Sequence, residues 1–169
     1  MAKIERKPSP KGRKGDWSKV SNLKFLVDFM DEMGLTTTSV AEKVGLSRQS
    51  VFYWLDKDEA KLSAVDNVFK AFGYKLTFDY EKIRPEGTAS ITMNVRKEEE
   101  VSDGRLLSFL DNALNRYRID RASVCEAIGI GKTTIYYWLT HDDIFVSYIF
   151  KIADAAGLKV KICINPIER

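Results

Sequence analysis

The segment with the most distinctive chemical pattern is Gly129-Ile130-Gly131-Lys132-Thr133-Thr134, whose glycines and lysine have the composition of a phosphate-binding loop. A nucleotide-binding P-loop has the spacing G-x-x-x-x-G-K-(S/T), so a loop that ends at Thr133 requires glycine at position 126. Glu126 stands there instead. The segment also follows a helical pattern, whereas a P-loop follows a strand. The spacing therefore argues against a nucleotide site.

Residues that form metal sites or nucleophilic centres are scarce. The chain holds two cysteines, Cys125 and Cys163, and one histidine, His141. They are too few for a disulfide framework or an ordinary structural zinc site, and neither cysteine has an identifiable base. We interpret the cysteines as small apolar side chains and His141 as an exposed loop residue. The sequence predicts no catalytic residue, no metal and no cofactor, and we expect that the protein is not an enzyme.

Length and composition indicate a soluble, globular protein. The chain has 169 residues, of which 44% are hydrophobic and 30% charged, enough for one ordinary domain or two very small ones. No apolar run approaches the roughly 20 residues that cross a bilayer. The first residues also lack the apolar region of a secretory signal. We therefore expect a cytoplasmic location and no membrane partner.

An internal repeat organises the chain. When the sequence is aligned with itself so that Leu23 matches Leu107, residues 23–80 align with 107–164 without a gap, and 15 of the 58 aligned pairs are identical. In this repeat alignment Tyr53-Trp54-Leu55 matches Tyr137-Trp138-Leu139, and many of the remaining pairs exchange similar apolar residues. The sequence therefore predicts two copies of one small fold.

Four helices and then a strand are predicted in each copy. In the first copy, apolar residues recur at helical spacing up to Gly34. The next three helices have candidate N-caps at Thr36, Ser47 and Ser63. After Gly73, apolar and polar residues alternate over 76–81, as in a strand with one buried face. The second copy repeats this plan, with Asp120 at the position of Thr36.

The segment between the copies is predicted to contribute one more strand. Residues 90–96 alternate in the same way, and the preceding Arg84-Pro85-Glu86-Gly87 is a good turn, so residues 75–96 should form a hairpin. The three strands either form one antiparallel sheet or pair with other molecules. The predicted organisation is a disordered basic arm (1–16), a first repeat with its strand (17–82), a return strand and acidic linker (83–104), and a second repeat with its strand (105–169).

Two capped helices joined by a glycine turn make a helix-turn-helix motif. Residues 35–51 read LTTTSVAEKVGLSRQSV. They resemble the phage-repressor and Cro-type (XRE-like) family, whose pattern is L-T-Q-x-x-L-A-x-x-x-G-(V/L)-S-x-x-x-(I/V). The match covers about 19–73 and, more weakly, 105–157. The resemblance implies a mainly α fold with a small antiparallel β-sheet, built from two tandem lambda-repressor-like helix-turn-helix bundles that are each followed by a β-strand.

The resemblance places the second helix of each motif in the major groove of double-stranded DNA. The residues that would read bases are Arg48, Gln49, Ser50 and Tyr53 in the first copy and Lys132, Thr133, Thr134 and Tyr137 in the second. These types suit base reading because Arg or Lys binds guanine, Gln binds adenine, and Thr contacts the thymine methyl group. The resemblance also implies phosphate contacts by Thr37, Arg121 and Ser47.

The expected function is therefore sequence-specific DNA binding by a transcriptional regulator of the nucleoid, which reads an imperfect palindrome with two recognition helices per chain. The strands would join the two copies as an intramolecular pseudo-dimer, or two chains as a homodimer. Residues 1–16 carry six basic and two acidic side chains, and the whole chain has a net charge of +3. This arm, with Lys11, Arg13 and Lys14, either contacts DNA or only aids solubility.

Other features favour a protein-protein interaction module, antitoxin-like or anti-repressor-like, on the same scaffold. Outside the arm the chain is close to neutral. The loops at 55–59 and 139–143 are acidic where the family has E-N-G-K, so they either turn away from DNA or change the docking angle. Aromatic residues stand at two further positions of each copy. Phe52 and Tyr136 replace residues that are often polar in the family, and they either pack against the other copy, stack on sugar or cover the sheet. Trp54 and Trp138 stand at a position that is buried in the family, so we expect both in the core.

Overall fold

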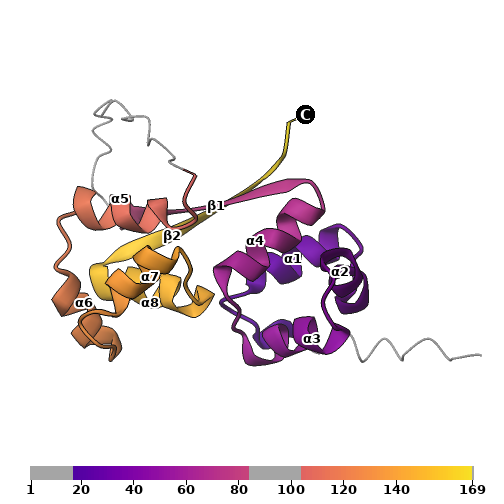
Figure 1. Cartoon of the computed structure of the whole chain (residues 1–169), viewed down its shortest axis with the longest axis horizontal. Coiled ribbons are helices and arrows are strands. Elements are labelled where there is room, and N and C mark those ends of the chain that lie inside the picture. Colours follow the sequence, from indigo (N-terminus) through magenta and orange to yellow (C-terminus); the bar gives the residue numbers. More distant parts are fainter. Residues whose placement is uncertain (1–16, 84–103, 169) are drawn as a thin grey trace, which may run out of the picture. The chain divides into compact units, whose positions relative to one another are not determined.

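The computed structural model describes residues 17–83 and 104–168 (Figure 1). Over these residues the protein has eight α-helices and one two-stranded antiparallel sheet, which confirms the predicted mainly α fold with a small antiparallel β-sheet. The basic arm with Lys11, Arg13 and Lys14, the turn at 84–87 and the strand predicted at 90–96 lie outside the described residues. Among the residues described, no helix is long and apolar enough to cross a membrane.

The first compact unit ends at Ala60 and contains three helices. After a short 3-10 helix (Trp17–Lys19) come α1 (Lys24–Glu32), α2 (Thr37–Val44) and α3 (Arg48–Lys57). The apolar stripe of each helix is buried and includes Leu26 on α1, Val40 on α2 and Val51 on α3. Burial of one such aliphatic side chain contributes roughly 1.5–3 kcal/mol to stability.

Polar caps and a glycine turn fix the path from α2 to α3. The Thr36 hydroxyl accepts the Ser39 N–H, and the Ser39 hydroxyl accepts the Thr36 N–H, which completes a capping box. Gly45 ends α2 with φ of 72°, a left-handed conformation in which a side chain is strained. The Ser47 hydroxyl then accepts the Ser50 N–H at the start of α3. The caps predicted at Thr36 and Ser47 are confirmed.

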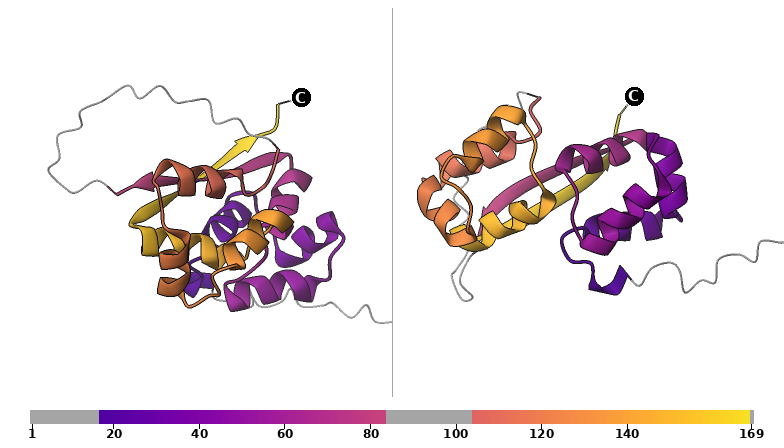
Figure 2. Two further views of the ribbon diagram at one scale, coloured as in Figure 1. Left: turned by 60° about the vertical axis from the view of Figure 1, so that its left-hand side comes forward. Right: turned by 60° about the horizontal axis from the view of Figure 1, so that its bottom comes forward.

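The second compact unit begins at Lys61 and contains the remaining elements. These are α4 (Leu62–Ala71), β1 (Tyr74–Lys82), α5 (Ser108–Arg116), α6 (Arg121–Ile128), α7 (Thr134–His141), α8 (Val146–Ala156) and β2 (Leu158–Pro166). The helix α6 is capped by Asp120, as predicted, because its carboxylate accepts the Ala122 N–H. The two strands lie side by side along their whole length (Figure 2).

The start of α4 differs from the prediction. Ser63 is not its N-cap, because α4 begins at Leu62 after Lys61, which makes no side-chain cap bond. Instead, the Asp143 carboxylate accepts both the N–H (3.0 Å) and the hydroxyl (2.6 Å) of Ser63. The Leu62 N–H donates to the Ile144 carbonyl. A carboxylate 80 residues away along the chain therefore replaces the local cap.

The inner face of β1 carries Leu76, Phe78 and Tyr80, which are all buried. Helices α4 and α5 pack on β1, and α8 packs on β2. The ring of Phe109 on α5 stacks on Phe78 with centroids 5.8 Å apart. The Tyr80 hydroxyl donates to the Ile149 carbonyl of α8 at 2.7 Å. Strand β1 thus contacts helices that precede and follow it along the chain, which explains why its predicted inner face is so completely buried.

The order of the elements recurs along the chain. The repeat alignment carries α1, α2 and β1 over to residues 108–116, 121–128 and 158–166. These are the observed bounds of α5, α6 and β2. Strand pairing follows the same alignment, because Phe78 lies opposite Ile162 in the centre of the antiparallel ladder. An isolated antiparallel bridge joins Lys61 and Phe145, which the repeat alignment also matches. In both places, a residue pairs with the residue to which it is aligned in the repeat.

Candidate nucleic-acid interface

Three of the four residues predicted to read bases in the first copy are exposed on α3. Arg48 and Gln49 are exposed in its first turn, and the Tyr53 side chain is 60% exposed, whereas Val51 and Leu55 are buried. The helix therefore exposes a guanidinium, an amide and a phenol. Hydrogen-bonding groups of these kinds can recognise base edges.

Two other predicted residues of this segment are already engaged in the N-cap of α3. The Ser47 hydroxyl accepts the Ser50 N–H, and the two hydroxyls lie 2.8 Å apart. Ser50 is also half-buried. These serines are therefore placed to hold the first turn of α3 in position, and Arg48 and Gln49 lie in that turn. Thr37 is half-buried at the first position of α2.

Exposed aromatic rings lie beside the polar groups of α3. Phe52 is exposed, and the ring of Trp17 contacts it edge-on with centroids 5.2 Å apart. The Lys57 ammonium lies 5.8 Å from the centre of the Tyr53 ring. Such cation-aromatic contacts at exposed sites contribute roughly 0.5–1 kcal/mol. Phe52 and Tyr53 therefore add exposed apolar area beside the hydrogen-bonding groups of α3.

The corresponding helix of the second unit, α7, differs at its start. Lys132 and Thr133 are exposed but lie in a turn before the helix, which begins at Thr134. Thr134 is half-buried, and Tyr137 is 60% exposed, like its counterpart on α3. Gly131 stands at the position aligned with Ser47 and has no hydroxyl to cap the helix. The predicted residues are thus held by different local structures in the two units.

A charged cluster forms where α5, α6 and α7 meet. Arg121 pairs with Asp111 at 3.3 Å, and its guanidinium lies 5.2 Å from the centre of the Tyr136 ring. Asp111 also pairs with Arg105 at 3.5 Å. The structure therefore brings the predicted phosphate contact Arg121 next to the exposed face of α7. Two arginines and one carboxylate leave a net positive charge in this cluster.

Asp120 stands beside that cluster at the N-terminus of α6. The Ser123 hydroxyl and the Ala122 N–H both donate to its carboxylate and hold its pKa below the usual value. The carboxylate is therefore ionised at neutral pH, and it reduces the positive charge at this end of α6.

Two aspartates in the acidic loops act within the fold. The Asp58 carboxylate accepts the N–H groups of Ser21, Asn22 and Leu23, just before α1, at 3.0–3.2 Å. The Asp142 carboxylate accepts the backbone N–H groups of residues 106 and 107, before α5, at 2.8 Å each. Sequence reasoning missed this role, although the two aspartates match each other in the repeat alignment. In both loops the aspartate therefore anchors the segment that leads into a helix, α1 or α5.

The structure shows the surroundings of His141, Trp138 and Trp54. His141 is not in a loop but ends α7, where its Nδ1 lies 2.9 Å from the Tyr137 carbonyl and its ring stacks on Tyr137. Trp138 is buried as predicted, with 7% exposed, and packs on Tyr148. Trp54 is only half-buried, contrary to the prediction, and the residue aligned with Tyr148 is Ala64, which has no ring.

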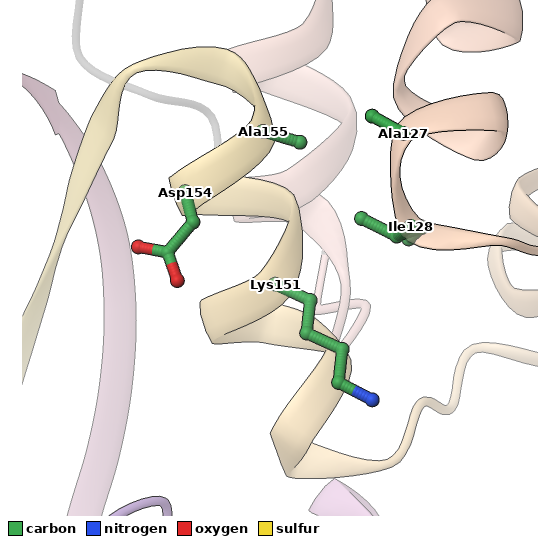
Figure 3. Close-up of a pocket in the computed structure, with 5 residues that line it drawn as sticks. All are labelled: Ala127, Ile128, Lys151, Asp154 and Ala155. Carbon is green, nitrogen blue, oxygen red and sulfur yellow. The ribbon is translucent and has the colours of Figure 1, made fainter.

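The described residues include a shallow hollow and hold no cluster suited to a metal. The hollow is about 430 Å³ and lies open between α6 and α8 (Figure 3), lined by Ala127, Ile128, Lys151, Asp154 and Ala155. Both cysteines are free thiols, Cys125 buried and Cys163 half-buried. In the described part of the chain, no three His, Cys, Asp or Glu residues gather closely enough to bind a metal ion.

The geometry of α2 and α3, and of α6 and α7, is thus that of a helix, a left-handed glycine and a second helix with polar and aromatic residues facing outward. Comparison with known proteins found no family model, no curated protein and no solved structure that matches the chain.

Proposed function

We propose that this protein binds double-stranded DNA sequence-specifically and regulates transcription on the nucleoid. The observation that carries the proposal is the exposure of Arg48, Gln49 and Tyr53 on α3. This helix is capped and follows a glycine turn. In a helix-turn-helix protein this helix enters the major groove with its N-terminal residues against the base edges.

Each exposed group has a chemical role in this proposal. The guanidinium of Arg48 would form two hydrogen bonds to guanine O6 and N7, and the amide of Gln49 would bind adenine N6 and N7. A bidentate contact of this kind discriminates against the wrong base by about 1–3 kcal/mol. The ring of Tyr53 would contact a thymine methyl group or a sugar. Thr37 and Arg121 would bind phosphates and fix the register of the protein on the duplex.

The proposal includes two helix-turn-helix units per chain that arose by duplication. Its support is the recurrence of the elements in the repeat alignment and the pairing of aligned residues, Phe78 with Ile162 and Lys61 with Phe145. A two-fold interface brings equivalent segments together in this way. A single chain would then read an imperfect palindrome, as two subunits do in a dimer.

The test is selection of bound sequences from a random duplex library at physiological salt, using the full chain. We expect enrichment of one motif, followed in a fluorescence titration by binding that is at least about 1,000-fold tighter than binding to scrambled duplex. Arg48→Ala should lower affinity for the motif by about 5-fold to 100-fold and leave affinity for scrambled DNA nearly unchanged. Equal losses on both duplexes would contradict base reading by Arg48.

A protein-protein interaction module is the second candidate, and the exposed aromatic side chains favour it. Phe52, Tyr53, Tyr136 and Tyr137 are all at least 43% exposed. Aromatic residues are enriched at protein interfaces. If the library yields no motif and binding to DNA is weak and lost at moderate salt, this candidate takes first place. The same four side chains are then the first to replace in a search for the partner surface.

A further inference from the structure

The two candidate recognition helices begin differently. Helix α3 begins at Arg48, and the Ser47 hydroxyl caps it. Helix α7 begins at Thr134, two residues later than the repeat alignment would place it. Its N-cap, Thr133, has φ of −91° and ψ of −5° and makes no side-chain cap bond. The difference follows from the sequence, because Gly131 stands where the first unit has Ser47.

This difference falls on the residues that would read bases. Arg48 and Gln49 lie in the first turn of a capped helix, so their backbone direction is fixed. Lys132 and Thr133 lie in a turn before the helix. Binding sites on helices hold side chains more accurately than sites on loops, and recognition requires placement within about 0.5 Å. Lysine also lacks the rigid fork with which arginine binds guanine.

The second unit carries more positive charge where DNA phosphates would lie. Arg118 and Arg121 flank the start of α6, and the aligned residues of the first unit are Gly34 and Thr37. Asp120 lies between these arginines, and Asp111 pairs with both Arg121 and Arg105. Together these three arginines and two aspartates carry +1, whereas residues 34–37 carry no charge. The backbone of Arg118 has φ of 50°, in the left-handed region where a side chain is strained. Gly34 adopts the same type of conformation without that strain. Arg118 is exposed, three residues before the start of α6.

We propose that the two units divide the recognition of DNA, an inference that rests on the proposed function. The first unit reads base sequence through Arg48 and Gln49. The second unit binds the sugar-phosphate backbone through Arg118 and Arg121 and has little sequence preference. Gly131 is the residue that determines this difference, because it leaves α7 without a capped first turn.

The first test compares base reading in the two units with the motif obtained from library selection. The motif should contain one half-site with strongly preferred bases and one that is weakly specified. Arg48→Ala should lower the ratio of motif affinity to scrambled-duplex affinity by about 5-fold to 100-fold. Lys132→Ala should leave that ratio within about twofold, because Lys132 lies in the turn before α7 and in this proposal does not discriminate between bases. Both side chains are exposed, and thermal unfolding of each variant checks that the fold is retained.

The second test restores the missing cap. An added Cβ at Gly131 meets only the Thr134 hydroxyl, at 3.4 Å, so a serine fits. Gly131→Ser should allow its hydroxyl to accept the Thr134 N–H, as Ser47 does with Ser50, and should sharpen the preferred bases of the weak half-site. Gly131→Ala is the matched control because it adds the same carbon without the cap. We expect motif affinity to differ by about fivefold between the two variants, the value of one N-cap.

The third test addresses backbone binding. Arg118→Gly should lower affinity for the motif and for scrambled duplex by the same factor and make the salt dependence less steep. Two equally specified half-sites, or an equal loss of specificity with Lys132→Ala and Arg48→Ala, would overturn the inference and leave the proposed function intact. Absence of any enriched motif would overturn the proposed function itself. The two failures are therefore distinguishable.

Discussion

Two aspartates, Asp58 and Asp142, have the clearest physical role of the individual residues, because each one anchors a segment that leads into a helix. Asp58 and Asp142 both follow a candidate recognition helix in a left-handed conformation, with φ of 53° each. Their carboxylates accept backbone N–H groups from the segment before the first helix of the same bundle. Backbone N–H groups need an acceptor when they lose contact with water, so a carboxylate that accepts several of them fixes the segment that leads into the helix.

Replacement of Asp58 by alanine should therefore destabilise the protein. The three N–H groups at Ser21, Asn22 and Leu23 would lose an acceptor. We expect a loss of about 1–3 kcal/mol in the free energy of unfolding, measured with urea at pH 7. Asp56→Ala is the matched control, because its carboxylate is exposed and lies 4.0 Å from the Lys57 ammonium, a weak contact. Equal losses for the two variants would refute the anchoring role.

At the scale of elements, α4 and β1 depend on groups from distant segments. The Asp143 carboxylate binds both the N–H and the hydroxyl of Ser63 at the start of α4. The Tyr80 hydroxyl of β1 donates to the Ile149 carbonyl of α8. These bonds join elements that are far apart along the chain, so they contribute to tertiary structure as well as to the local helix or strand.

A double-mutant cycle should reveal the coupling between Asp143 and Ser63. Asp143→Ala removes the acceptor for three donors, the N–H and hydroxyl of Ser63 and the N–H of Ile144, and should cost about 1–3 kcal/mol. In the Ser63→Ala background the same change should cost less, because one donor is already absent. We expect an interaction energy of about 0.5–2 kcal/mol from urea unfolding of the four proteins. Additive losses would show that the contact between the two side chains contributes nothing to stability.

Tyr80 should make stability depend on pH in the alkaline range. Burial raises the pKa of its hydroxyl above the usual value of about 10. A group whose pKa is higher in the folded state contributes stability that is complete below its unfolded pKa and is lost as the pH rises above about 10. Tyr80→Phe should lower the free energy of unfolding by about 1 kcal/mol at pH 7, because the hydrogen bond from the Tyr80 hydroxyl to the Ile149 carbonyl is lost. The difference in the free energy of unfolding between wild type and variant should narrow by about pH 11. A difference that stays constant with pH would contradict this account.

At the scale of the whole molecule, the central feature is the ladder between β1 and β2. Phe78 faces Ile162, the residue to which it is aligned in the repeat, and pairing extends equally on both sides of this point. The ladder runs from Tyr74 opposite Pro166 to Lys82 opposite Leu158. Such self-pairing is the arrangement of a two-fold interface. In the proposed function it lets one chain act as two subunits.

The stoichiometry of binding tests this proposal. Sedimentation of the full chain with an excess of the selected duplex should give one protein chain per DNA molecule that carries both half-sites. Nuclease protection should extend over both half-sites, with centres about 10 base pairs apart. Two chains per duplex, or protection of a single half-site, would contradict the intramolecular pseudo-dimer while leaving DNA binding itself intact.

Local features of the fold were predictable because their physical causes lie within a few residues. The cap at Thr36, the turn at Gly45 and the cap at Ser47 depend on neighbouring backbone groups, and the structure confirms all three. The alternation after Gly73 predicts β1 because side-chain direction in a strand has a period of two. The outward position of Gln49 and Tyr53 follows from the apolar spacing of α3. Arg48 shares the helical spacing of Val51 and Leu55 and is exposed because it is the first residue of the helix.

Only the tertiary structure showed which distant groups meet. The sequence placed the cap of α4 at Ser63, and the structure assigns that task to Asp143 because chain folding brings the carboxylate within hydrogen-bond distance. The acidic loops suggested repulsion of DNA, yet Asp58 and Asp142 bind backbone N–H groups before α1 and α5. The partner of β1 among the described residues is β2, since strand pairing depends on contacts between segments that lie far apart along the chain. Hydrogen bonds and apolar contacts of this range leave no periodic pattern in the sequence, and so only the folded chain decides them.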